Sequence, residues 1–318
     1  MPGDNLLGST QTLDASVNTV ISEFILRREV KSTMRTLARS MPLKPHEGPS
    51  KYVNLYNRFT AYDLTDGVDM VFGQQVTDTQ TSFTPGEVGL KVVIPKTTIR
   101  RIADTRFLKN VGMMIEYAYD RKEDTDGCTQ LASFTNGLGS AGTVASPGHL
   151  IAAETQLSLG QSRSDPELVP KPYFGVFHGC SVVALAGRIM PLATTPAGGT
   201  AYGVNTGAHL GVSTTLGPGN SMTDELLKEG PQKLSKFGGV EVYIDNHISV
   251  DSSDDAINAV FSREGLIYVP EMEPSENQTV DYSARAVEIV YVGSYGWGNF
   301  RPGILGLKMT FDASMPTS

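Results

Sequence analysis

The chain has 318 residues, with 40% hydrophobic side chains, 19% charged side chains and a formal net charge of −8. This composition is typical of a globular protein large enough for one large or two smaller domains, and it excludes an intrinsically disordered chain. The acidic balance, without a block of Lys and Arg, excludes a dedicated nucleic-acid binder but not a protein that encloses DNA. We also expect no secretory signal in MPGDNLLGST and no membrane-spanning helix, because no stretch of about 18 apolar residues occurs.

The N-terminal region predicts a mobile arm followed by a helix. Residues 1–12 are polar, and from Asp14 onward apolar side chains recur at helical spacing toward Leu37. Pro42 and Pro45 end any such helix.

Residues 52–94 predict a projecting hairpin. Tyr52 to Phe59 alternates, with Val53, Leu55 and Phe59 on one face and Tyr52, Asn54 and Tyr56 on the other. Val88 to Ile94 forms a second strand that Pro95 stops. The polar stretch TDGVDMVFGQQVTDTQTSFTPGE lies between them. Because so long a loop inside a domain is unusual and is often functional, we expect it to project from the subunit.

Asp104 to Phe134 predicts one long helix, roughly 46 Å long if continuous at about 1.5 Å per residue. Gly112 and Gly127 weaken it and allow a kink. We expect Met114 and Ala118 to face a sheet.

The remaining residues predict mixed helices and strands. Ser146 and Pro147 begin a helix that closes at Gly160, and residues 191–220 form a nearly uncharged loop that is either mobile or ordered by partners. A capping box at Ser221 predicts a short helix to Gly230. Further strands are expected at 174–177, 240–244, 266–269, 285–292 and 304–311, and a further helix at 181–187. The fold class is therefore α+β.

Catalytic motifs are weak in this sequence. Gly137 to Gly142 matches G-x-G-x-x-G, but a helix precedes it and the next helix begins only after Ser146, so we interpret it as a flexible hinge. The two cysteines lack CxxC spacing, which favours reduced thiols in a cytoplasmic protein. None of the five histidines has a metal-ligand spacing to another His, Cys or acid. We therefore expect no catalytic, cofactor-binding or metal-binding residues, and no enzyme.

Three segments resemble one branch of phage capsid sequences: GVDMVFGQQVTDTQTSFTPGEVGLKVVIPKTTIRRIAD, KFGGVEVYIDNHI and ARAVEIVYVGSYGWGNFRPGILGLKM. The order of elements over most of residues 14–312 is similar to the Hong Kong 97-type fold of tailed-bacteriophage major capsid proteins. The resemblance implies an N-terminal arm and helix (1–54), an extended β-hairpin loop (55–100), a peripheral domain with a spine helix (101–139), an axial domain (140–240) and a return to the peripheral domain (241–318).

The resemblance implies a major capsid protein that self-assembles, as pentamers and hexamers, into the icosahedral shell enclosing the phage genome. It implies a virion location after assembly in the host cytoplasm, a separate scaffolding protein and portal, no cofactor, no membrane and no sequence-specific DNA binding. The inter-subunit crosslinking known in some members is not carried over, because its Lys–Asn–Glu constellation cannot be placed here.

The polar tip of the hairpin is the candidate interface. Acids and amides cannot form a core, but they can pair with basic groups of a neighbouring subunit. The proposed tip residues are Asp66, Asp69, Gln74, Gln75 and Asp78, and the proposed basic partners are Arg27, Arg28, Arg100 and Arg101. Two alternatives stay open: another virion structural protein, such as a tail-tube or adhesin subunit, and a nucleotide-cofactor enzyme that uses the Gly137 loop.

Overall fold

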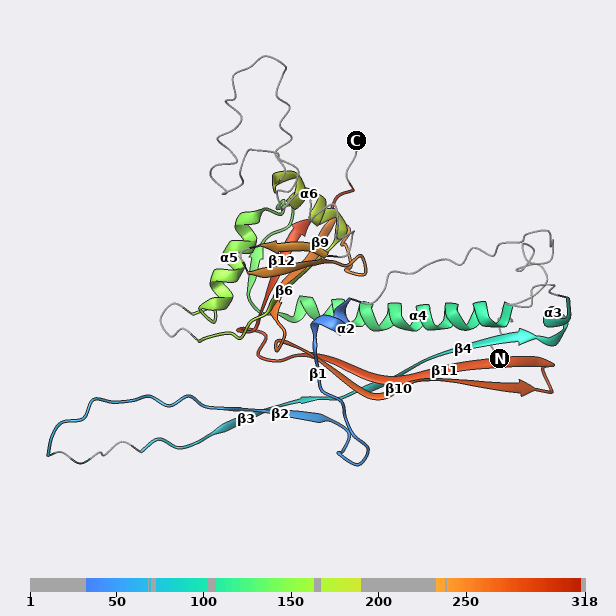
Figure 1. Ribbon diagram of the computed structural model, residues 1–318, viewed down its shortest axis with the longest axis horizontal. Coiled ribbons are helices and arrows are strands. Elements are labelled where there is room, and N and C mark those ends of the chain that lie inside the picture. Colours follow the sequence, from blue (N-terminus) through green and yellow to red (C-terminus); the bar gives the residue numbers. More distant parts are fainter. Residues whose placement is uncertain are drawn as a thin grey trace, which may run out of the picture.

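A computed structural model describes residues 33–67, 69, 73–101, 107–162, 167–189, 233–237 and 239–315. The molecule is elongated and combines helices with sheets, as the α+β expectation requires (Figure 1). A long helix lies along a long sheet, and a compact body with its own sheet sits at one end of that helix (Figure 1). A hairpin projects away from the long sheet, in the direction opposite to the far end of the long helix (Figure 1). The expected helix from Asp14 and the features predicted within 191–230 lie outside the described residues. No described helix has both the length and the apolar character needed to cross a membrane.

The long sheet has the strand order β1-β10-β11-β4. Its strands are β1 (Arg39–Ser40), β10 (Leu266–Asp281), β11 (Ala286–Asn299) and β4 (Gly86–Pro95). β11 pairs antiparallel with both β10 and β4, and its register with β4 runs from Ala286 opposite Pro95 to Tyr295 opposite Gly86. Helix α3 (Lys96–Arg101) follows β4 directly at the end of this sheet farthest from the hairpin (Figure 1).

Helix α4 (Phe107–Thr129) continues as the 3-10 turn η1 (Gln130–Ser133), which confirms the long helix. Its predicted inner face is wrong, however, because Met114 is 50% exposed and Ala118 is only partly buried. Ile115 and Tyr119 face the sheet instead, one helical turn apart, with Ile115 in an apolar cluster beside Ile94 and Ile289. An offset of one residue rotates the face by about 100°, which explains the error.

Gly127 permits a close approach rather than a kink. A Cβ added to Gly127 would lie 2.9 Å from Cβ of Met34 and 3.1 Å from the Trp297 ring. Met34 begins the short helix α2 (Met34–Leu37), whose buried side chains pack against α4. The glycine therefore lets α2 and β11 both contact the same point of the long helix.

The hairpin is formed by β2 (Lys51–Tyr56) and β3 (Asp78–Phe83), paired antiparallel from Lys51 opposite Phe83 to Tyr56 opposite Asp78. The prediction that 88–94 is the second strand of this hairpin is wrong, since those residues belong to β4 and pair with β11. The chain leaves β3 through Phe83, which is 7% exposed and packs in the cluster of Leu43, Ile267 and Val269. This cluster anchors the base of the hairpin to the long sheet.

The compact body contains a six-stranded sheet in the order β5-β12-β9-β6-β8-β7. Its strands are β5 (Gly137–Gly139), β12 (Gly306–Asp312), β9 (Asp255–Ser262), β6 (Tyr173–Phe177), β8 (Val240–Ile244) and β7 (Lys233–Phe237). Helices α5 (Pro147–Ser158) and α6 (Gly179–Ile189) cover one face, and η1 with the end of α4 covers the other. The alternation predicted for β12 is confirmed, because Leu307, Met309 and Phe311 are all buried in the core under α5 and α6.

Candidate functional site

The connection between β2 and β3 is held together by side-chain amides. Asn57 Oδ1 accepts a hydrogen bond from Thr77 N at 2.8 Å, and Asn57 Nδ2 donates to Gln75 O at 3.1 Å. Further out, Gln74 Oε1 accepts from Thr60 N at 2.8 Å, and Gln74 Nε2 donates to Thr60 O. The two arms of the hairpin are therefore tied to each other beyond the last strand pair, and Gln74 has an internal role that the sequence did not indicate.

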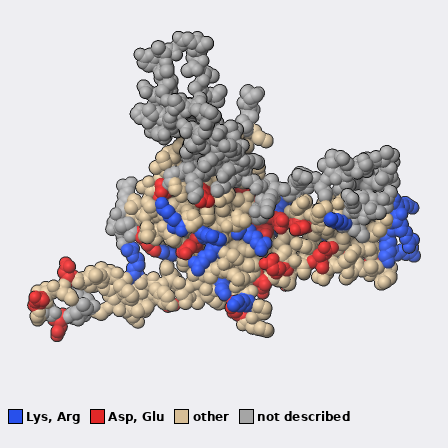
Figure 2. Space-filling model, viewed as in Figure 1, with Lys and Arg blue, Asp and Glu red and all other residues tan. Residues whose placement is uncertain are grey.

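The predicted acidic residues of the tip are all exposed. Asp66 and Asp69 lie in the connection itself, and Asp78 begins β3 opposite Tyr56. Figure 2 shows Asp and Glu side chains gathered at the far end of the hairpin. The tip therefore presents carboxylates to the surroundings of the subunit.

The predicted basic partners lie at the other end of the molecule. Arg100 and Arg101 are exposed in the last turn of α3, and Figure 2 shows Lys and Arg side chains gathered over that end. Arg27 and Arg28 lie outside the described residues. Within one subunit the hairpin tip and α3 point in opposite directions (Figure 1), so the structure does not bring the predicted partners together in one chain.

The hairpin also carries exposed apolar side chains that sequence reasoning did not single out. Tyr56 is 64% exposed and Phe59 is 58% exposed. We call the whole set the hairpin apolar strip: Tyr52, Tyr56, Phe59, Tyr62, Leu64 and Val76. The signal was present in the outward positions of the alternating segment, Tyr52 and Tyr56. Exposed apolar patches of this kind mark surfaces that bind other proteins.

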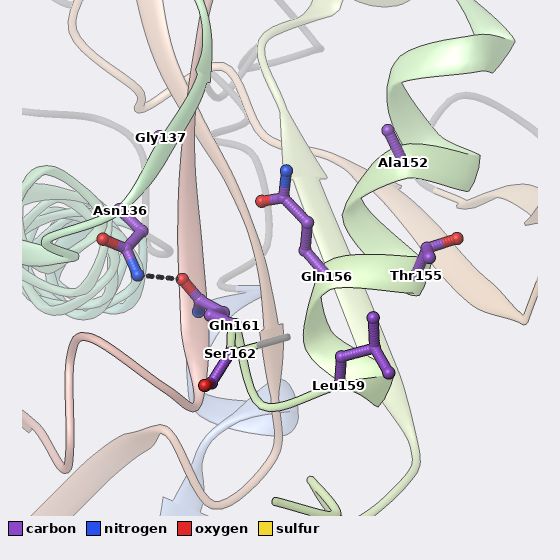
Figure 3. A pocket seen from close by; sticks show the side chains of 8 residues that line it. All are labelled: Asn136, Gly137, Ala152, Thr155, Gln156, Leu159, Gln161 and Ser162. Carbon is purple, nitrogen blue, oxygen red and sulfur yellow. Dashed lines mark hydrogen bonds between the residues drawn. The ribbon is translucent and has the colours of Figure 1, made fainter. Parts of the chain in front are cut away.

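The Gly137 loop does not have the geometry of a dinucleotide site. Gly137 to Gly139 form β5, which pairs parallel with β12, so the interpretation as a flexible hinge is wrong for these residues. A cavity of about 560 Å³ lies next to them (Figure 3), beside α5. Asn136 donates a hydrogen bond to Gln161 across it. None of its lining residues has an ionisable side chain: Asn136, Gly137, Ala152, Thr155, Gln156, Leu159, Gln161 and Ser162.

A buried polar cluster joins α4 to the connection that follows β8. Asp124 Oδ2 lies 2.7 Å from His247 Nδ1, and Asp245 Oδ1 lies 3.2 Å from the same nitrogen. Burial and the neighbouring Asp124 carboxylate raise the pKa of Asp245. The sequence offered no histidine at a metal-ligand spacing, but folding brings Asp124 beside Asp245 and His247. The sequence held a weak local signal, Asp245 two residues before His247, but Asp124 joins them only through folding.

Comparisons with known proteins identify the fold. No protein-family model matches the chain, and no curated protein matches it. The chain is similar to the head structure of Helicobacter pylori bacteriophage KHP40, with a TM-score of 0.67, 11% identity, and coverage of 92% of this chain and 95% of that chain. It is also similar to the mature capsid of bacteriophage PhiM1, with a TM-score of 0.64, 14% identity, and coverage of 99% and 98%.

An encapsulin structure is also similar to this chain. The SrpI encapsulin complex of Synechococcus elongatus matches with a TM-score of 0.58, 9% identity, and coverage of 96% of this chain and 97% of that chain. Coverage of 92% or more of each chain in these three matches shows that the likeness extends over the overall fold. The chain has the Hong Kong 97-type fold of bacteriophage capsid subunits that the sequence resemblance implied.

Proposed function

We propose that this chain is the major capsid protein of a bacteriophage and assembles into the icosahedral shell that encloses the phage genome. The observation that carries the proposal is the match to the PhiM1 mature capsid over 99% of this chain and 98% of that chain. In this proposal the subunit forms pentamers and hexamers, assembles in the host cytoplasm with a separate scaffolding protein and a portal, and ends in the virion.

An encapsulin-type protein is the second candidate, and the SrpI match supports it. The phage assignment is favoured by the higher TM-scores of the phage structures, 0.64 and 0.67 against 0.58, and by the three capsid-like segments of the sequence. Nuclease-protected DNA inside particles from infected cells distinguishes the two. Particles without such DNA, made in cells that carry no phage, would favour the second candidate.

The proposed domain division follows the ranges 1–54, 55–100, 101–139, 140–240 and 241–318. The β2–β3 hairpin supports an extended loop within 55–100, with β4 fastening its end to the long sheet. Helix α4 supports a spine in 101–139, and the six-stranded sheet with α5 and α6 supports an axial body to which the final strands contribute.

We propose that the hairpin lies over a neighbouring subunit. Exposed ion pairs contribute about 0.2–1 kcal/mol each, whereas full burial of a large apolar side chain contributes about 1.5–3 kcal/mol. The hairpin apolar strip therefore supplies most of the affinity. The acids at the tip, facing Arg100 and Arg101 of the neighbour, set which subunits meet and in which orientation. Repetition by the symmetry of the shell multiplies these modest contributions.

Charge exchange tests this interface. The variant with Asp66→Lys and Asp69→Lys, and the variant with Arg100→Glu and Arg101→Glu, should each reduce shell yield because like charges then meet. Combining all four substitutions should restore much of that yield. Glu116→Lys, a charge change at an exposed position of α4 away from the hairpin tip, serves as the control and should assemble normally. A variant with all four substitutions that assembles no better than either double variant would exclude the contact between the tip acids and Arg100 and Arg101.

Deleting residues 68–78 and closing the gap with a short turn tests the hairpin as a whole. None of the described residues within 68–78 belongs to the four core clusters, so the variant subunit should unfold at nearly the wild-type temperature. It should nevertheless form no shells. Shells of normal yield and stability would show that the hairpin has no role in assembly.

A further inference from the structure

We propose that Asp124, Asp245 and His247 form a binding site for one divalent transition-metal ion, with Zn²⁺ as the ion that fits best. The site lies where the long helix α4 meets the six-stranded sheet. It is independent of the proposed shell function, since it lies inside one subunit and uses none of the hairpin residues.

The three side chains already converge. One ligand atom from each lies within 4.8 Å of the other two. Asp124 comes from α4, while Asp245 and His247 follow β8, so the cluster joins two separate layers of the fold. One oxygen of each carboxylate is held in place by backbone N–H groups. Asp124 Oδ1 accepts hydrogen bonds from Thr33 N and Met34 N, both at 2.9 Å. Asp245 Oδ1 accepts a hydrogen bond from His247 N at 2.9 Å. These backbone contacts fix both carboxylates before any ion binds.

The cluster concentrates two carboxyl groups and one imidazole in a buried position. The side chains of Asp124 and Asp245 are both 0% exposed, and His247 is 12% exposed. When both carboxyl groups are ionised, a protonated imidazole balances only one of them. Asp245 Oδ2 is buried and has no hydrogen-bond partner among the described residues, which is costly for a carboxylate oxygen. An unpartnered buried oxygen beside a second carboxylate and an imidazole is a position that a cation would stabilise.

The donor set selects the ion. Imidazole favours Zn²⁺ and related transition metals over Mg²⁺ or Ca²⁺, and carboxylates are common additional zinc ligands. Zinc bonds of about 2.0–2.1 Å in a tetrahedral site place ligand atoms about 3.3 Å apart. The separation of 3.2 Å between His247 Nδ1 and Asp245 Oδ1 is close to that value, and the 2.7 Å contact between His247 Nδ1 and Asp124 Oδ2 would lengthen on binding. Carboxylates and imidazole bind a metal ion in their deprotonated forms, so Zn²⁺ affinity should fall as the pH is lowered.

The test uses the full-length chain stripped of metal with a chelator and titrated with Zn²⁺ by calorimetry and thermal unfolding. We expect one Zn²⁺ per chain and a rise of several degrees in the unfolding midpoint at saturating Zn²⁺. Asp245→Asn and His247→Gln should each weaken Zn²⁺ binding at least tenfold. His46→Asn, which alters an exposed histidine away from the cluster, should bind Zn²⁺ like the wild type. Failure of the wild type to bind Zn²⁺, or binding unchanged in both cluster variants, would overturn the proposal.

A second measurement needs no substitution, so a variant that misfolds cannot obscure the answer. X-ray absorption of the wild-type chain with one equivalent of Zn²⁺ should show one imidazole nitrogen and otherwise oxygen neighbours at about 2.0–2.2 Å. Two or more imidazoles in the zinc shell, or a fully hydrated ion, would place Zn²⁺ elsewhere and overturn the assignment.

Discussion

Ile115→Ala tests which face of α4 packs on the long sheet. Ile115 is 3% exposed and lies in the cluster with Ile94 and Ile289. The substitution removes about three methylene equivalents, at about 0.8 kcal/mol each, and leaves a cavity that neighbouring side chains fill only in part. We therefore expect the free energy of unfolding to fall by about 3 kcal/mol, within the usual range of about 2–5 kcal/mol for such changes.

Met114→Ala is the matched control one residue earlier on the same helix. Met114 is 50% exposed, so its truncation should change the free energy of unfolding by less than about 0.5 kcal/mol. Urea unfolding of the unassembled subunit, followed by circular dichroism, measures both variants, and the slope with urea should match the wild type. Equal losses in the two variants, or a larger loss for Met114→Ala, would refute the assigned face.

Two further predictions concern the contacts of single residues. Arg301 Nη2 donates a hydrogen bond to Glu167 Oε2 at 2.6 Å, and this contact lowers the pKa of Glu167. The pair therefore stabilises the fold at a pH above the ordinary pKa of a glutamate. This stabilisation is lost as the pH falls through the lowered pKa. Glu167→Gln should therefore cost about 0.5–1 kcal/mol at pH 7, and the difference from wild type should disappear in urea unfolding at acidic pH; a difference that persists or grows there would contradict the pairing. Gly306→Ala would place a Cβ inside the ring of the buried Phe134, so the variant should lose about 1–3 kcal/mol or more in the same assay, and wild-type stability would show that the ring moves freely.

The sequence predicted the elements whose side chains repeat regularly against a core. Helix α4 and strands β8 and β12 have buried positions at their own periods, and strand β6 is buried at every position. The structure has each of them within a few residues of the predicted bounds. Strand β3, with the sequence DTQTSF, was missed because its side chains are mostly exposed and backbone pairing with β2 maintains it. The part of β10 that follows Val269 was missed for the same reason, because its side chains are mostly exposed.

The candidate sites were less accessible to sequence reasoning. The exposure of the acidic tip followed from its polarity, but the length of the molecule between that tip and Arg100 could not be read from local patterns. The Asp124–Asp245–His247 cluster also needs Asp124, which is far from the other two in the chain, so the short Asp245–His247 spacing alone could not reveal it. The predicted inner face of α4 was wrong because apolar residues such as Met114 and Ile115 are adjacent in the sequence. Only packing decides which of the two faces the sheet.

Electron microscopy of the purified, concentrated full-length chain, with and without its co-expressed scaffolding partner, tests the proposed shell function most directly. We predict closed, roughly spherical shells of uniform diameter, built from pentamers and hexamers. Tubes or fibres, or monomers alone under every condition including phage lysates, would contradict it.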